Sequence, residues 1–258
     1  MSARIQIQIN ASEVAALIGE NRFVSTEDAF IRLWKRNDEN SYYNAVKSIE
    51  TLELFEEREQ HFEDLGKLGN LGKLGKEKEK FKEDLIEATS KDAYYNGRTI
   101  GALKRLEAKI EDIGSRDAVR KYIFTTIGKT LENKSLDAYE RESNTKVVER
   151  NEKRYSTMIS DNVNIVGRVD GIDKVNHLVI EHKQRQHKLS EKVSSHEMIQ
   201  LIVYMKLAGY RKARLVESYR RSLWYTTIEW PGNDYWNDIK SKLLEQVNQV
   251  NQVIADWS

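Results

Sequence analysis

The sequence from Val163 to Lys183, VNIVGRVDGIDKVNHLVIEHK, predicts two β-strands joined by a short turn. Valine, isoleucine and leucine supply the apolar and largely β-branched content of both strands. Gly171 and the polar residues 174–176 supply the turn between them. The segment is therefore expected to form a β-hairpin.

Three charged side chains lie at the ends of the two expected strands. Side chains alternate between the faces of a strand, so Glu181 and Lys183 share one face and His182 points to the other. If the strands pair, the hairpin brings Asp170, at the end of the first strand, beside Glu181. Two carboxylates and an ammonium group at one sheet edge suit a hard divalent cation and an attacking water molecule.

Composition limits the size of the protein and the kinds of partner. A chain of 258 residues can bury one good core, and its net charge of +1 indicates no particular partner. The local charge is more informative, because the segment 183–221 carries ten Lys and Arg against three Asp and Glu. This basic segment suits a polyanion, and a solvated surface is the alternative interpretation.

Several classes of protein are excluded or unsupported. The sequence has no cysteine, which excludes disulfides, thiolate-bound zinc and cysteine-bound iron–sulfur clusters. No apolar run approaches the ~20 residues that a membrane helix needs, and no signal peptide is evident. The five histidines lack zinc-ligand spacing, and no Walker loop or dinucleotide-binding glycine set is present. A soluble intracellular protein that does not contact a membrane is the default expectation.

The N-terminal segment predicts a strand followed by a helix. Residues 3–9 alternate apolar and polar side chains, as a short strand does. Asn10 is expected to begin a helix that ends at Gly19, with Glu13 as its capping-box partner. Ser12 lies in the first turn, where free backbone N–H groups favour an anion, although it has the alternative of being an ordinary first-turn serine.

Residues 46–114 are expected to be a helical insertion in a smaller core. Apolar residues recur at helical spacing in three segments, residues 46–65, 77–90 and 97–113. Residues 65–76 repeat a Leu-Gly-x triplet four times, and each glycine costs a helix about 1 kcal/mol relative to alanine. We expect a flexible connector here. The alternative is a flap that presents three lysines to nucleic acid, Lys67, Lys73 and Lys76.

The remaining elements alternate between helices and strands. They are a helix from Ser25, a long helix over 116–141, a strand over 154–159, a helix over 195–208, two strands over 214–219 and 223–230, and a last helix after Pro231. Gln200 and Tyr204 are one turn apart on one helix face. The expected fold class is α/β, a single domain over residues 1–258 with a central mixed sheet flanked by helices.

The order of these residues resembles a known family. Asp170 followed by Glu181-x-Lys183 resembles the PD-(D/E)xK nuclease signature, with Val169 where the signature has proline. Three further blocks resemble the lambda-exonuclease or YqaJ-like viral recombinase branch, which includes alkaline exonucleases. They are Asn10-Ala-Ser12 to Gly19, Gly128-Lys-Thr-Leu-Glu132-Asn and Gln200-x-x-x-Tyr204. The resemblance omits roughly residues 46–114.

The resemblance implies a restriction-endonuclease-like fold and Mg²⁺-dependent hydrolysis of DNA, with Mn²⁺ able to replace Mg²⁺. Asp170 and Glu181 would hold the metal, with the carbonyl of Ile180 or His182 as a further ligand. Glu132 would reach the metal from its helix, directly or through water.

The same resemblance assigns roles to three other side chains. Lys183 would position or help deprotonate the attacking water and offset charge in the transition state. Gln200 would orient Lys183 or the scissile phosphate, and Tyr204 would support Gln200.

The resemblance also implies a substrate and partners. It implies 5′-to-3′ digestion of linear duplex DNA in recombination or DNA end processing, a single-strand annealing protein as partner, and a ring-shaped homo-oligomer. Ser12 by resemblance, and Arg185 and Lys188 from the basic segment, are expected to bind DNA phosphates. A site- or structure-specific endonuclease and a DNA-binding protein without catalysis are the alternatives.

Overall fold

The computed structural model describes residues 6–48, 75–110 and 113–258. Residues 49–65 of the helical pattern expected over 46–65, and nearly all of the Leu-Gly-x repeat, lie outside these residues. Of the repeat, only residues 75–76 are described, and their backbone begins helix α5. The connector and the flap therefore both stay predictions.

The described elements follow one another in mixed order. They are β1 Ile7–Asn10, η1 Ala11–Glu13, α1 Val14–Leu17, α2 Thr26–Asn37, α3 Glu39–Ser48, α5 Gly75–Thr89, α6 Lys91–Tyr95, α7 Thr99–Glu107, α8 Ile113–Ser143, β2 Val147–Val148, β3 Arg154–Ser160, β4 Val163–Arg168, β5 Gly171–Asp173, β6 Leu178–Gln184, α9 Ser195–Ala208, β7 Lys212–Tyr219, β8 Ser222–Glu229 and α10 Asn233–Trp257. The expected α/β class is confirmed, and most of the expected elements appear close to their expected positions.

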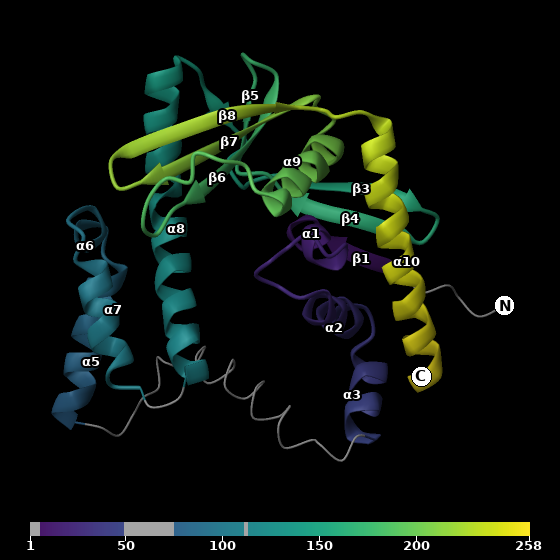
Figure 1. The fold of residues 1–258 in the computed structure, drawn as a ribbon, viewed down its shortest axis with the longest axis horizontal. Helices are drawn as coiled ribbons and strands as arrows, with labels where there is room; N and C mark the ends of the chain where they lie inside the picture. Colours follow the sequence, from purple (N-terminus) through teal and green to yellow (C-terminus); the bar gives the residue numbers. More distant parts are fainter. Residues whose placement is uncertain (1–5, 49–74, 111–112) are drawn as a thin grey trace.

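The strands of the described residues form two mixed sheets, with helices around them (Figure 1). One sheet has the order β1-β4-β3, in which β1 and β4 are parallel. The other has the order β2-β5-β6-β7-β8, in which β6 and β7 are parallel and the other pairs are antiparallel. Parallel neighbours far apart in sequence need a crossover, which α9 supplies between β6 and β7.

The hairpin expected over residues 163–183 is corrected in one respect. Its first strand, β4, pairs with β1 and β3 rather than with the second strand, β6. The chain leaves one sheet after Arg168 and enters the other at Gly171, and the hairpin partner of β6 is the short strand β5. Asp170 lies at this crossing between the sheets, one residue before β5. Because Gly171 pairs with Ile180, Asp170 still arrives beside Glu181.

Strand β6 lies between two helices and presents a different face to each. Val179 belongs to the hydrophobic core that α9 and α10 share with the first sheet. Leu178 and Ile180 pack instead with Leu136 and Tyr139 of α8. Alternation along the strand then turns residues 181 and 183 toward α9, and residues 182 and 184 toward α8.

The N-terminal helix is shorter than expected and lacks its capping box. Asn10 makes no side-chain capping bond, and the chain forms one 3₁₀ turn followed by the four-residue helix α1. Glu13 instead pairs with Arg36 of α2, at 2.5 and 2.7 Å. A charged partner distant in sequence outcompetes the local capping bond. The next helix does begin after Ser25 as expected, and the Ser25 hydroxyl caps it by accepting the N–H of Asp28 at 3.0 Å.

Helices α5, α6 and α7 pack against the first half of α8 and form a second hydrophobic cluster. In Figure 1 they lie to one side of the sheets, with α8 between. The hydroxyl of Tyr94 on α6 donates to the carbonyl of Arg185 at 2.8 Å and accepts from the side-chain amide of Gln184 at 2.6 Å. The helical cluster is therefore bonded directly to the end of β6.

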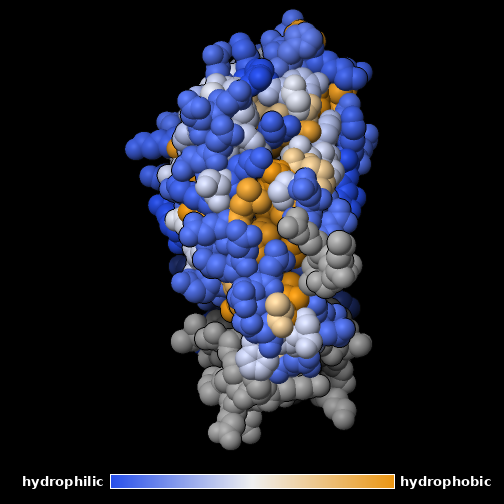
Figure 2. Space-filling view, turned by 90° about the vertical axis from the view of Figure 1, so that its right-hand side faces the viewer, coloured by the Kyte–Doolittle hydropathy of each residue, from blue (hydrophilic) through white to orange (hydrophobic). Residues whose placement is uncertain are grey.

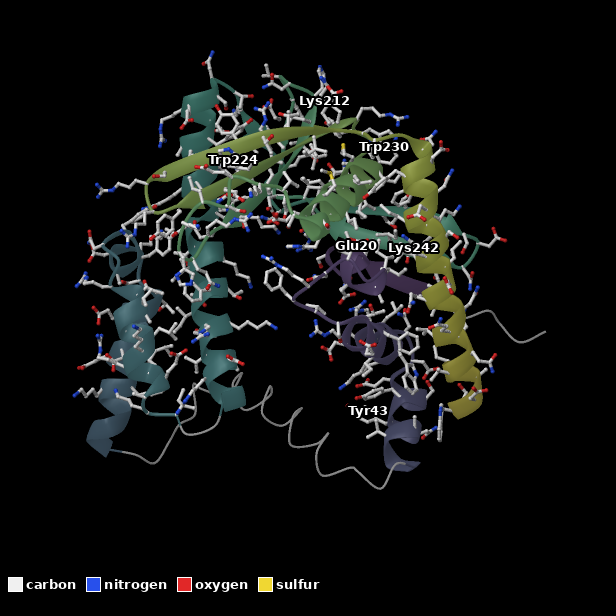
Figure 3. The ribbon with its side chains drawn as sticks, viewed as in Figure 1. Glu20, Tyr43, Lys212, Trp224, Trp230 and Lys242 are labelled. Carbon is white, nitrogen blue, oxygen red and sulfur yellow. The ribbon has the colours of Figure 1, made fainter. Side chains whose placement is uncertain are left out.

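The last helix, α10, runs along the opposite side of the molecule. Six of its apolar side chains are buried at helical spacing, as expected: Trp236, Ile239, Leu243, Val247, Val250 and Ile254. Lys242 lies beside Glu20, which follows α1 (Figure 3). The face that bears α10 is mostly hydrophilic, with a hydrophobic strip running down it (Figure 2). None of the helices in the described residues is long and apolar enough to cross a membrane.

Candidate active site

Four polar side chains form a chain of contacts between β6 and α9. The Lys183 ammonium donates to Glu181 Oε1 at 2.6 Å and to Gln200 Oε1 at 3.0 Å. The amide of Gln200 donates in turn to the Tyr204 hydroxyl at 3.1 Å. The strand supplies the first two groups on one face and the helix supplies the others one turn apart, as the sequence predicts.

Asp170 joins this group from the crossing between the two sheets. Its Oδ2 accepts the backbone N–H of His182 at 2.7 Å, which fixes the carboxyl against the edge of β6. Burial raises the pKa of Asp170 well above its ordinary value, and the nearby charges of Glu181 and Glu132 raise it further. Without a cation beside it, this carboxyl therefore holds its proton to a higher pH than an exposed aspartic acid does.

Glu132 approaches the same point from α8. It accepts a hydrogen bond from the side chain of Asn151, in the turn after β2. Burial raises the pKa of Glu132, and the charge of Glu181 raises it further. The mutual effect of three carboxyl groups shows that Glu132, Asp170 and Glu181 lie within electrostatic range of one another.

The donor set fits a divalent cation. In the described residues no three histidine or carboxylate side chains are already close enough to enclose a metal ion. One atom nevertheless lacks a partner, because Glu181 Oε2 is buried and accepts no hydrogen bond. A buried carboxylate oxygen is costly when unpaired. A cation between Glu181 and Asp170 would pair it and would favour the charged forms of the carboxyl groups whose pKa values are raised.

Behind the site, a polar network joins β6 to α8. His182 Nε2 lies 2.7 Å from Ser218 Oγ on β7, and Ser135 of α8 donates to the same hydroxyl at 3.0 Å. Burial lowers the pKa of His182 to about 3, so this imidazole is neutral at physiological pH. The side chain of His182 is thus part of the packing between sheet and helix.

A second polar feature lies beside Tyr204. A pocket of about 300 Å³ is lined by the end of β1, by η1, by facing parts of β3 and β4, and by Tyr204. Ser12 and two arginines, Arg154 and Arg168, contribute to its wall, and the arginines are register partners across the strand pair. Gly167 permits the close approach, because a Cβ there would lie 2.8 Å from Ala11 Cβ.

The three residues expected to bind DNA have different surroundings. Ser12 and Lys188 are exposed. Arg185 instead bonds Glu197 Oε1 at 2.7 Å and Glu217 Oε1 at 2.9 Å, and both carboxylates are almost completely buried. The guanidinium therefore ties the segment after β6 to α9 and β7.

Three polar side chains at this site, Asn151, Arg154 and Arg168, were not expected from the sequence. Pairing of the strand expected over 154–159 with the strand that begins at Val163 could have placed Arg154 opposite Arg168. Asn151 follows no periodic pattern, so no comparable sequence signal was available for it. The six residues expected to act in catalysis are brought together from α8, the sheet crossing, β6 and α9.

Comparisons with known proteins add a family and distant structural likenesses. Residues 50–257 match the sequence model of the PD-(D/E)XK nuclease superfamily. No curated protein matches the chain. An alkaline exonuclease from Laribacter hongkongensis is similar with a TM-score of 0.44 and 14% identity, over 66% of this chain and 87% of that one. A phage-related exonuclease from Haemophilus somnus 129PT is similar with a TM-score of 0.47 and 14% identity, over 98% and 97% of the two chains.

Proposed function

Because the chain belongs to the PD-(D/E)XK nuclease superfamily, we propose that it is a metal-dependent deoxyribonuclease that uses Asp170, Glu181 and Lys183. One observation carries this proposal. The buried Oε2 of Glu181 has no partner, while Oε1 of the same carboxylate holds the Lys183 ammonium at 2.6 Å. This arrangement suits metal-assisted hydrolysis, because Glu181 Oε2 is free to bind a cation and the Lys183 ammonium lies next to it.

Asp170 and Glu181 are proposed to hold Mg²⁺, with Mn²⁺ as a substitute and Glu132 as a third carboxyl, bound directly or through water. The carbonyl of Ile180 or His182 is a further proposed ligand. The metal ion would supply Lewis acidity at the phosphate and would lower the pKa of bound water. Because the pKa values of Asp170 and Glu132 are raised, protons compete with the cation for these two groups.

Lys183 is proposed to orient the attacking water and to offset negative charge on the phosphate as the bond breaks. Burial opposes its charged form, but the charge of Glu181 and the hydrogen bond to it raise the pKa of Lys183. The ammonium is therefore charged at neutral pH and serves as a donor. Gln200 fixes its direction, and Tyr204 fixes Gln200.

The finer proposal is an exonuclease of the lambda-exonuclease type, acting 5′-to-3′ on linear duplex DNA in recombination or end processing. The order of the motif blocks in the sequence supports it, as does the pocket beside Tyr204. Ser12, Arg154 and Arg168 offer one hydroxyl and two guanidinium groups to a phosphate next to the carboxylates. Lys188 is proposed to bind the backbone further along. A single-strand annealing partner and a ring of identical subunits complete this proposal.

The helical segment is proposed to be an insertion within a single nuclease domain. Helices α5, α6 and α7 have their own apolar cluster, and Tyr94 joins that cluster to β6. Packing of this kind suits an addition that supports the core without supplying its carboxylates.

The proposal is tested with purified protein, Mg²⁺, and linear, nicked and covalently closed DNA, with each end of the linear substrate labelled in turn. We expect mononucleotides to be released progressively from the 5′ ends of linear duplex, no loss of closed circles, and no activity in EDTA. Cutting of closed circles would indicate an endonuclease instead. Binding without cleavage under all metal conditions would refute the nuclease proposal itself.

A further inference from the structure

Phe23, in the loop between α1 and α2, is the most exposed large hydrophobic side chain of the described residues, with 69% of its surface accessible. Single exposed apolar residues are common and need no function. Phe23 differs because its ring is held in place. Its N–H bonds Asn21 Oδ1 at 2.9 Å, an Asx turn that fixes the backbone, and the next residue, Val24, packs against the core.

Two side chains pack against the ring of Phe23. The guanidinium of Arg22 lies over Phe23, with its central carbon 4.6 Å from the ring centroid. The imidazole of His196 meets the ring edge-on, at 5.5 Å and an interplanar angle of 90°. The ring thus stays exposed although three neighbours, Asn21, Arg22 and His196, restrict its motion. A rigid and accessible aromatic face is what base stacking requires.

His196 connects this ring to the catalytic group. It lies four residues before Gln200 on α9, and therefore on the same face of that helix, about 6 Å away along the axis. The imidazole is itself fixed, with Nδ1 2.9 Å from the hydroxyl of Ser194. One face of α9 therefore carries a row of three side chains, Tyr204, Gln200 and His196, and the ring of Phe23 contacts the last of them.

The row has the dimensions of a short length of DNA strand. From Gln200, the helical step and the contact between the rings place Phe23 on the order of 10 Å away, which is about three nucleotides at 3.4 Å each. A strand with its phosphate at Lys183 would bring a base of an adjacent nucleotide to Phe23. In Figure 1 the loop between α1 and α2 projects away from both helices. The exposure of Phe23 in this loop leaves its ring accessible to a ligand.

We propose that Phe23 is a stacking platform for one nucleobase of the DNA strand bound at the active site, within three nucleotides of the scissile phosphate. One face of the ring stacks on the base, and the Arg22 guanidinium lies behind the ring. Because any base presents such a face, this contact places the strand without selecting a sequence. The inference rests on the proposed nuclease function. It assigns to Phe23 the role of positioning the DNA strand that is bound at the active site.

The test is a binding cycle between Phe23→Ala and an abasic scan of the DNA. A blunt hairpin duplex with a single open end would carry one abasic site in turn at each of the last four positions of either strand. Affinities would be measured without metal, where hydrolysis does not interfere. If Phe23 stacks on one base, removing that base or the ring should each weaken binding about tenfold, and removing both should cost no more than one removal.

Two controls separate stacking from other effects. Phe23→Trp keeps an aromatic face and should retain the wild-type abasic profile, whereas Phe23→Leu should lose it. Ile86→Ala, which removes another exposed apolar side chain from α5, should leave the profile unchanged. Identical abasic profiles in wild type and Phe23→Ala would overturn the proposal. That result would leave the nuclease proposal intact if wild type still cleaves DNA, so the two failures can be told apart.

Discussion

Replacement of Arg185 by alanine should destabilise the fold far more than it weakens any single DNA contact. The side chain is 22% exposed and pairs with Glu197 and Glu217, whose side chains are 2% and 0% exposed. Removing the guanidinium leaves two buried carboxylates without a cation. Breaking a buried ion pair in this way costs about 3–5 kcal/mol.

The lower end of that range applies, because other donors remain. Glu217 Oε2 still accepts the N–H groups of Ser190 and Glu191, and Glu197 Oε2 still accepts from Ser194. We therefore expect a loss of about 3 kcal/mol in the free energy of unfolding at pH 7. For a chain of this length, that is a fall of roughly 6–12 °C in Tm.

The loss should also depend on pH with a definite sign. Burial alone would raise the pKa of Glu197, but hydrogen bonds from Ser194 and the charge of Arg185 lower it below its ordinary value of 4.5. A carboxyl with a lowered pKa in the folded state stabilises the fold above its unfolded pKa, and this is lost as the pH falls through the folded value. The difference between wild type and Arg185→Ala should therefore narrow below about pH 4.5.

Urea unfolding at pH 7 and pH 4 would measure these differences, and Lys188→Ala is the matched control. It removes one positive charge from an exposed position in the same segment and should change the unfolding free energy by less than about 0.5 kcal/mol. It should instead reduce the salt slope of DNA binding by about one unit. If Arg185→Ala shows that change of slope with wild-type stability, Arg185 is a phosphate ligand and the structural reasoning fails.

Three further predictions concern the site and its support. Gly167→Ala places a methyl group 2.8 Å from a carbon of η1 and should cost about 1–3 kcal/mol in urea unfolding; an unchanged midpoint would show that the contact relaxes freely. Gln200→Ala should lower kcat more than Tyr204→Phe does, because only Gln200 contacts Lys183; the reverse order would contradict this arrangement. Because the pKa values of Asp170 and Glu132 are raised, Mg²⁺ should bind more tightly and release fewer protons as the pH rises through them, which calorimetry in buffers of different ionisation enthalpy would check.

Local patterns predicted the elements that carry the site. The long helix expected over residues 116–141 lies within α8, and its apolar residues at helical spacing, Val119, Ile123, Ile127 and Leu131, are all buried. The alternation along β6 correctly placed Glu181 and Lys183 on one face, and helical spacing placed Gln200 and Tyr204 on one face of α9. The approach of Gln200 to Lys183 was expected only from the family resemblance. Such periodic patterns are reliable because the spacing of apolar residues follows from which face of each helix or strand is buried.

Contacts between distant segments were out of reach of these patterns. The sequence could not show that β4 and β6 belong to different sheets, because both are apolar strands and the change of sheet takes only the residues around Asp170. It suggested a capping role for Glu13, but the Glu13 carboxylate pairs with Arg36 instead. It counted Arg185 as a free positive charge, although Glu197 and Glu217 are its partners. In each case a long-range charged or strand contact overrides a local rule.

One measurement tests the central claim most directly: single-turnover hydrolysis of end-labelled linear duplex by wild type, Glu181→Gln and Lys183→Ala, with Mg²⁺ and with EDTA. Lys174→Ala, in the exposed turn between β5 and β6, is the control. We predict cleavage by wild type and Lys174→Ala with Mg²⁺ only, and a loss on the order of 10²–10³-fold in either site variant. A folded Glu181→Gln or Lys183→Ala protein that cleaves at the wild-type rate, or full activity in EDTA, would contradict the proposed site.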